Sequence, residues 1–156
     1  MAYNSTTFRG AGTEILRCHH FELIDGAAAH KIIFGAQYHI YTVLSVIIHC
    51  NSLQATTNKI DMAILGYDTT ATSGGSAESC KIFRQLVAAG DTFVWNDKFS
   101  FNGHEPVAFT GPLDSVVKQD AIADQGSAVP QYLTLESTHA DDDYEVTVTF
   151  IDQNNA

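Results

Sequence analysis

The sequence predicts an all-β protein, an antiparallel β-sandwich or jelly roll of about eight to ten short strands. Three observations support this fold class. Apolar and polar residues alternate with a period of two along several segments, and turn residues separate these segments roughly every eight to twelve residues. At most one short helix, near residues 112–122, is compatible with the rest of the sequence. A chain of 156 residues is also long enough to bury one self-sufficient core.

The N-terminal half contains the strongest strand pattern. Residues 1–13 are polar and aperiodic, so we expect an extended arm there, followed by a single β-sandwich domain over residues 14–156. Alternation predicts strands over residues 14–24, 31–34, 38–50 and 59–67. In the long strand, one mainly apolar face is expected to hold Tyr38, Ile40, Thr42, Leu44, Val46, Ile48 and Cys50, and the other His39, Tyr41, Val43, Ser45, Ile47 and His49.

The C-terminal half is expected to contain short strands and a closing hairpin. The stretch QLVAAGDTFVWNDKFSFNG, residues 85–103, indicates strand, turn, strand, turn, strand, with the second turn at Asn96–Asp97. Another short strand is expected over 106–110, and residues 112–122 permit either a short helix or a long loop. The final hairpin joins QYLTLEST to YEVTVTFID across HADDD. Its last strand is expected to point Tyr144, Val146, Val148 and Phe150 into the core.

The charge balance argues against two classes of partner. The net charge is −10, from 18 acidic and 8 basic residues, and such a field repels nucleic-acid phosphates and anionic membrane surfaces. Charged residues make up only 17% of the chain, which favours a surface covered by a ligand or by a partner protein. Residues 1–30 show no signal-peptide pattern, and Cys18, Cys50 and Cys80 are interpreted as reduced and mostly buried. We therefore expect synthesis in the cytoplasm.

No residue pattern indicates an enzyme, a metal site or a cofactor. His19 and His20 are adjacent and would point to opposite faces of a strand, while His39 and His49 would lie about 30 Å apart. The chain has no His-x-His pair and no Gly-x-Ser-x-Gly. The acids Asp141–Asp143 have two interpretations, turn residues of a hairpin or ligands of a calcium ion. No catalytic residue is predicted.

One non-enzymatic interpretation is a sugar-binding sandwich. Exposed aromatic rings beside Asn and Asp are typical of carbohydrate sites, and Trp95, Asn96 and Asp97 form such a group at an expected turn. The alternative is that Trp95, the single tryptophan, fills the core, with Asn96–Asp97 as ordinary turn chemistry. We expect Trp95 to be largely buried.

The other interpretation is a structural subunit packed against copies of itself or a larger lattice. The second face of the long strand mixes Tyr, His and aliphatic residues, a composition that suits an interface and also a covered central strand. The candidate interface residues are His39, Tyr41, Val43, Ile47 and His49, together with Tyr3, Phe8 and Arg9 of the arm.

The second half of the chain, over residues 80–153, resembles small structural proteins of tailed bacteriophages. The matching pieces are FRQLVAAGDTFVWNDKFSF, YLTLEST and DDDYEVTVTFID. This resemblance implies a β-sandwich virion component without catalytic residues or a cofactor, most simply a capsid decoration (cement) protein. Its partners would be the major capsid protein and further copies of itself, with a trimer favoured, and its place the outer capsid surface. A carbohydrate- or receptor-binding module of a tail or head fibre is the alternative that the resemblance leaves open.

Overall fold

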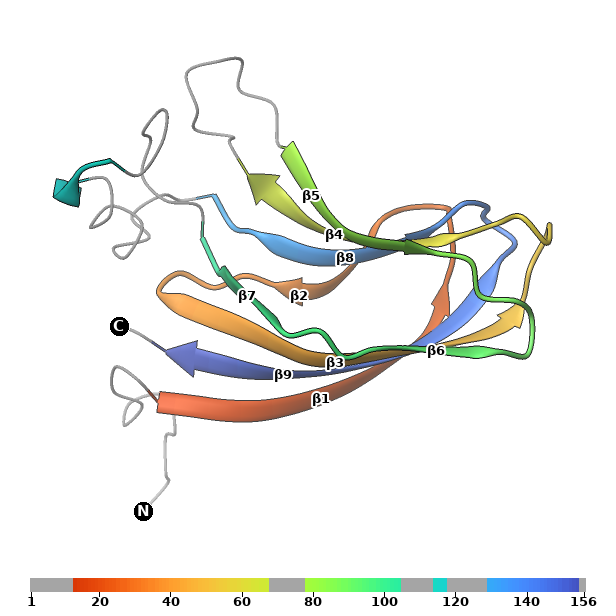
Figure 1. Cartoon of the computed structure of the whole chain (residues 1–156), viewed down its shortest axis with the longest axis horizontal. Helices are drawn as coiled ribbons and strands as arrows, with labels where there is room; N and C mark the ends of the chain where they lie inside the picture. The colour runs from red at the N-terminus through yellow and green to blue at the C-terminus, as the bar shows by residue number, and fades with distance from the viewer. Residues whose placement is uncertain (1–12, 68–77, 105–113, 118–128, 155–156) are drawn as a thin grey trace.

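The computed structural model describes residues 13–67, 78–104, 114–117 and 129–154, and it confirms the predicted β-sandwich. Two antiparallel sheets pack face to face in this part of the chain (Figure 1). No helix of these described ranges is long and apolar enough to span a membrane. The strands are β1 (Thr13–Ile24), β2 (His30–Phe34), β3 (His39–Ser52), β4 (Ile60–Tyr67), β5 (Glu78–Gln85), β6 (Thr92–Trp95), β7 (Phe99–Asn102), β8 (Tyr132–Ser137) and β9 (Asp143–Asn154).

The strand order is that of a jelly roll. The larger sheet, here called sheet A, runs β1-β9-β3-β6, and β7 also pairs with β3. The smaller sheet, sheet B, runs β2-β8-β4-β5. If β6 and β7 are counted as one interrupted edge strand, each sheet has four strands, and the long connections cross between the sheets as in two Greek keys. The sheets thus leave one outward face each, on opposite sides of the molecule.

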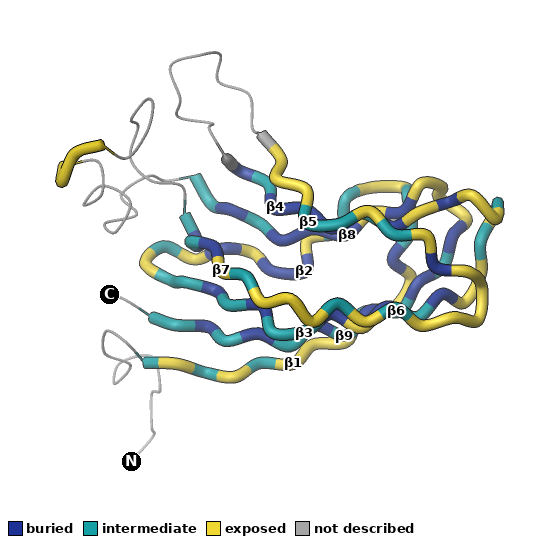
Figure 2. The backbone as a smooth tube through the Cα atoms, in the orientation of Figure 1, coloured by how far each residue is buried: buried dark blue, intermediate teal, exposed yellow. Residues whose placement is uncertain are grey.

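The apolar core is formed by residues of both sheets. Figure 2 shows buried segments along the strands of each sheet. Strand β9 follows the prediction: Tyr144, Val146, Val148 and Phe150 are all buried. They face buried leucines and isoleucines of sheet B, including Leu133 and Leu135, which are fully buried. Removing this apolar surface from water is the main term that stabilises such a sandwich.

The predicted faces of the long strand are wrong in its first half. Tyr41 and Val43 are buried in the core, with exposed fractions of 5% and 0%, and so are Val46, Ile48 and Cys50. The inward phase therefore changes from odd to even residue numbers within β3. The cause is a β-bulge, because Val43 pairs with Phe150 and Ser45 with Thr149, which leaves Leu44 as an extra residue.

The predicted meander over residues 85–103 is also corrected. Strand β5 belongs to sheet B and β6 to sheet A, so the chain crosses the sandwich between them. Both β6 and β7 pair antiparallel with β3, so residues 96–98 interrupt one edge strand and do not form a hairpin turn. The interruption lies opposite the bulge, since β6 pairs up to Val46 and β7 up to Val43.

One end of the sandwich is closed by a close approach of main chains. The Gly103 N–H donates to the His39 carbonyl at 2.7 Å, and the Gly103 carbonyl accepts from Gln131 N–H at 2.8 Å. A Cβ on Gly103 would lie 1.9 Å from the Ala36 carbonyl oxygen, so only glycine fits there. The strand expected over 106–110 and most of the helix expected near 112–122 lie outside the described residues. Within the described range 114–117, Val116 and Val117 have helical backbone.

Candidate functional site

The outward face of sheet A, the five-stranded sheet, is a candidate interaction surface that the strand registers define. Because Val146, Val148 and Phe150 point inward, Thr147, Thr149 and Ile151 of β9 point away from the core. Residues opposite one another in an antiparallel ladder share a face, so the registers extend this surface over all five strands. We call it the neutral face: Leu16, Cys18, His20, Thr42, Ser45, Ile47, His49, Thr92, Val94, Ser100, Thr147, Thr149 and Ile151.

Cross-strand hydrogen bonds use many of the polar atoms of the neutral face. His20 Nδ1 lies 2.9 Å from Thr147 Oγ1, and His49 Nδ1 lies 2.9 Å from Thr92 Oγ1. A third bond joins the hydroxyls of Thr42 and Ser100 at 2.8 Å. Because these groups bond along the surface, covering the face would leave few of their donors and acceptors unpaired.

The neutral face carries no formal charge when its histidines are neutral, although the whole chain has a net charge of −10. Acidic side chains adjoin it at Glu14, which pairs with Gln153, and at Glu145, which pairs with His49. Apolar side chains on it remain exposed: Leu16 is 67% accessible and Val94 46%. A surface with an uncharged centre and charged side chains at its edges has the composition of a protein–protein interface.

The structure separates the predicted interface residues of β3. Ile47 and His49 lie on the neutral face, as the interface hypothesis requires. Tyr41 and Val43 lie in the core instead, because the Leu44 bulge reverses the alternation, so their side chains are not available to a partner. The remaining predicted interface residues, Tyr3, Phe8 and Arg9, lie outside the described residues.

The fifth predicted residue of β3, His39, lies beside a cleft between the sheets. His39 Nδ1 contacts Asp152 Oδ1 at 2.6 Å, and Arg17 Nε contacts Asp152 Oδ2 at 3.0 Å. The cleft has a volume of about 270 Å³ and includes Phe21, Tyr41 and the buried Asp152 in its lining. Since Asp152 has partners on two other strands, this ion-paired group ties β1, β3 and β9 together.

Sequence reasoning missed the contribution of β1 to the surface. Leu16, Cys18 and His20 were not among the predicted interface residues, yet they complete the neutral face at one edge of sheet A. The alternation over residues 14–24 predicted the strand, and it could also have indicated which side chains of the strand point outward. The signal was weak because His19 and His20 break the contrast between polar and apolar residues.

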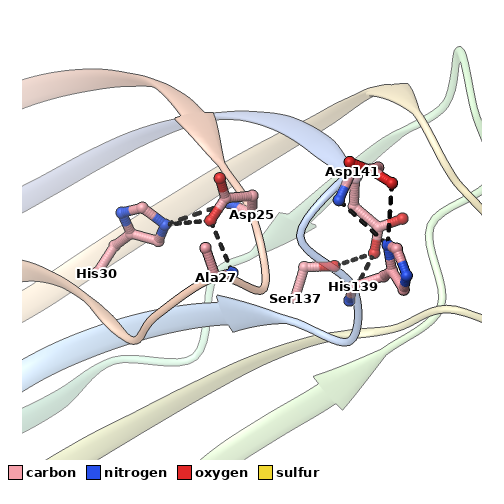
Figure 3. A network of polar contacts seen from close by, with 7 residues as sticks. Asp25, Ala27, His30, Ser137, His139 and Asp141 are labelled. Atoms are coloured by element: carbon pink, nitrogen blue, oxygen red, sulfur yellow. Dashed lines mark hydrogen bonds and ion pairs between the residues drawn. The ribbon is translucent and has the colours of Figure 1, made fainter.

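Asp141 and Asp142 lie in the connection between β8 and β9, and Asp143 is the first residue of β9. Figure 3 shows Asp141 close to His139 in this connection. Asp142 is buried and accepts four hydrogen bonds: from Gln54 N–H and Asn58 Nδ2, both at 2.9 Å, from His139 N–H at 3.2 Å, and from the Ser137 hydroxyl. Burial raises the pKa of Asp142, but these hydrogen bonds outweigh it and leave the pKa below its ordinary value. Hydrogen-bond donors of the protein itself therefore offset the cost of burying the negative charge of Asp142.

A second polar pair holds the β1–β2 turn nearby. Asp25 Oδ1 lies 2.9 Å from His30 Nε2 and accepts from Ala27 N–H at 3.0 Å, as Figure 3 shows. The hydrogen bond from His30 lowers the pKa of Asp25. Within the described ranges, no group of three or more His, Cys, Asp or Glu side chains is arranged to hold a metal ion.

The cysteines differ from the prediction in their exposure. Only Cys50 is buried, and Cys18 and Cys80 are exposed free thiols on β1 and β5. Burial raises the pKa of the Cys50 thiol, which makes its reactive thiolate scarcer.

The predicted sugar-contact group does not form an exposed aromatic platform. Trp95 lies on the inward side of β6 and packs against Phe83 of β5, with ring centroids 5.3 Å apart. It is partly buried, less than the sequence led us to expect, while Asn96 and Asp97 are exposed. This arrangement closes the open edge of the sandwich and gives the sugar-binding interpretation no support.

Comparisons with known proteins found distant structural likenesses, of which two illustrate the range. No family model and no curated protein sequence matches the chain. A solved structure described as Bacillus endospore appendages that form disulfide-linked pili is 11% identical, with 95% of this chain and 94% of that chain covered and a TM-score of 0.42. A structure of the infectious bursal disease virus Gx strain is 12% identical, with 90% of this chain and 36% of that chain covered and a TM-score of 0.31. At these scores neither likeness assigns a function.

Proposed function

We propose that this chain is a non-enzymatic structural subunit that attaches to a protein lattice through its neutral face. The observation that carries the proposal is the uncharged, partly apolar surface that spans every strand of sheet A. The chain has a net charge of −10, and burying charged groups costs desolvation free energy. A continuous surface without formal charge is therefore the area that a partner can cover at the lowest desolvation cost.

In the more specific form of the proposal, the lattice is the outer capsid of a tailed bacteriophage and the chain is a decoration protein. The resemblance of residues 80–153 to small virion proteins supports this form. The major capsid protein would be the partner, and bound copies would fasten neighbouring capsid subunits against internal pressure. The acidic remainder of the surface would keep the protein from the packaged DNA.

Co-sedimentation with capsids tests the proposal. Purified protein is mixed with mature capsids of the related phage from which this protein has been stripped, and the saturating number of bound copies is measured. We expect saturation at a fixed multiple of the capsid lattice. No binding, or a dozen or fewer copies at one vertex, would contradict a decoration role and point to the tail or a fibre.

Two variants with equal exposure locate the attachment surface. Ile47 lies on the neutral face and Leu86 lies between β5 and β6, and each side chain is 41% exposed. Ile47→Glu should weaken capsid binding at least tenfold, because it places a charge in the centre of the proposed interface. Leu86→Glu should bind as the unaltered chain does. Equal effects of the two substitutions would exclude the neutral face as the attachment surface.

A further inference from the structure

The four sheet edges of the described chain differ in how they are protected from pairing with another strand. Sheet A ends at β1 and at the interrupted strand formed by β6 and β7, and sheet B ends at β2 and β5. An edge strand presents unpaired N–H and C=O groups, and natural proteins block such edges with short strands, bulges and charged side chains, especially Lys.

Three of these edges carry such protection. Strand β2 has only five residues and a register shift between Lys31 and Ile33. Strand β5 has two register shifts along its pairing with β4 and carries Lys81 and Arg84. The edge formed by β6 and β7 is broken over residues 96–98, and each of its pieces has only four residues. None of the three offers a long regular ladder.

Strand β1 has no bulge and no lysine over most of its length, and its one basic side chain there, Arg17, is ion-paired with Asp152 of the same sheet. It pairs with β9 in an unbroken register from Thr13 to Phe21, and its only register shift follows Phe21. This segment contains no Pro, Gly or Lys. Leu16, on its outward side, is 67% exposed. A regular edge strand of this kind is a template for a further strand.

We propose that β1 pairs antiparallel with β1 of a second copy of this chain, around a twofold axis at Arg17. Arg17 is the midpoint of the unbroken segment Thr13–Phe21, so this register uses the whole segment in both copies. On the outward side it places Leu16 opposite Cys18 of the second copy, two apolar groups. It also places Glu14 opposite His20 of the second copy.

Complementary polar groups support this register and a second copy as the occupant, because a carboxylate, which accepts hydrogen bonds, meets an imidazole, which can donate one. Each Glu14 carboxylate meets a histidine, and the twofold axis makes this contact twice. The Nδ1 atom of His20 already contacts Thr147 Oγ1 at 2.9 Å, so Nε2 is the atom that faces the carboxylate. The two Arg17 side chains meet at the axis, but each is ion-paired with its own buried Asp152 at 3.0 Å, which offsets their repulsion.

The pairing joins the two copies of sheet A into one continuous sheet. The two neutral faces then lie side by side, which doubles the surface available to a lattice and raises its effective affinity. A nine-residue edge contact is smaller than a standard protein interface, so the dimer is expected to dissociate at micromolar concentrations. The inference does not depend on the proposed function, because dimerisation is measured without a capsid.

Sedimentation equilibrium of the full chain, in reducing buffer from micromolar to millimolar concentration, tests the inference. We expect a reversible monomer–dimer equilibrium. Leu16→Lys should weaken it at least tenfold, because a lysine on the edge blocks strand pairing. Val94→Lys is the matched control: Val94 is 46% exposed on the opposite edge of the same sheet and should leave the equilibrium unchanged. A monomer at every concentration, a trimer, or a dimer weakened only by Val94→Lys would overturn the proposal.

A charge exchange tests the register without relying on Leu16. Glu14→Lys and His20→Glu should each weaken the dimer, since each creates a like-charge or unpaired contact across the axis. The double variant should restore it, because the introduced lysine of one copy then faces the introduced glutamate of the other in a reversed pair. Circular dichroism of each variant checks that the fold is retained. Failure of the double variant to recover, with the fold intact, would exclude the register centred on Arg17.

Discussion

Replacing Asp142 by Ala should destabilise the sandwich strongly. The substitution removes the acceptor of four hydrogen bonds, donated by Gln54, Asn58, Ser137 and His139. Hydrogen bonds to a charged group contribute about 1.5–3 kcal/mol each, but bonds that share one carboxylate are not additive. Since Asn58 and Ser137 are themselves buried and would lose their partner, we expect a loss of about 3–5 kcal/mol in the free energy of unfolding.

The effect should depend on pH in a defined direction. The folded pKa of Asp142 lies below its ordinary value, which is about 4 in an unfolded chain. The carboxylate therefore contributes its full stabilisation above about pH 4, and this contribution is lost as the pH falls through the lower folded pKa. The stability difference between the unaltered chain and Asp142→Ala should be constant near neutral pH and shrink in acid.

Urea unfolding followed by tryptophan fluorescence, repeated across pH, measures both effects. Asp141→Ala is the matched control, because Asp141 is the adjacent acid and its side chain is 79% exposed. This control should change the free energy of unfolding by less than about 0.5 kcal/mol. Equal losses for Asp141→Ala and Asp142→Ala, or a difference that grows in acid, would refute the assignment of Asp142 as a stabilising buried carboxylate.

Three further predictions test the fold. Gly103→Ala should lower the free energy of unfolding by several kcal/mol or prevent folding, since the new Cβ would lie 1.9 Å from a carbonyl oxygen. Gly90→Ala has open space around the new Cβ but a φ of +87°, so it should lower the free energy of unfolding by about 1–2 kcal/mol. Thermal unfolding measures both. Val43→Asp should prevent folding because it buries a charge in the core, while Ile47→Asp should be tolerated because Ile47 is 41% exposed. Circular dichroism measures both, and similar melting temperatures for the two variants would contradict the bulge at Leu44 and favour an unbroken alternation along the long strand. Thiol titration of the native protein should modify the two exposed cysteines quickly and Cys50 only on unfolding, and rapid reaction of all three thiols would contradict its burial.

The long strand shows how far alternation alone can predict the candidate site. Ile47 and His49 were predicted on a partner-facing surface, and the structure places both on the neutral face. The same pattern put Tyr41 and Val43 beside them, and those residues are buried. The error comes from Leu44, because no composition signal distinguishes a bulged residue from a regular one in an apolar run. Its position is visible only when the partner strand fixes the register.

Alternation of polar and apolar residues is enough to predict the fold class and the inward face of the final strand, where Tyr144 and Val146 alternate with polar residues. Such alternation follows from the period of a strand and requires no knowledge of its neighbours. Tertiary structure alone decided that β6 and β7 share one edge, that Cys18 is exposed, and that β1 is the long regular edge of sheet A. These features depend on which strands pair and in which register, and pairing joins residues more than a hundred positions apart, such as Cys18 and Thr149.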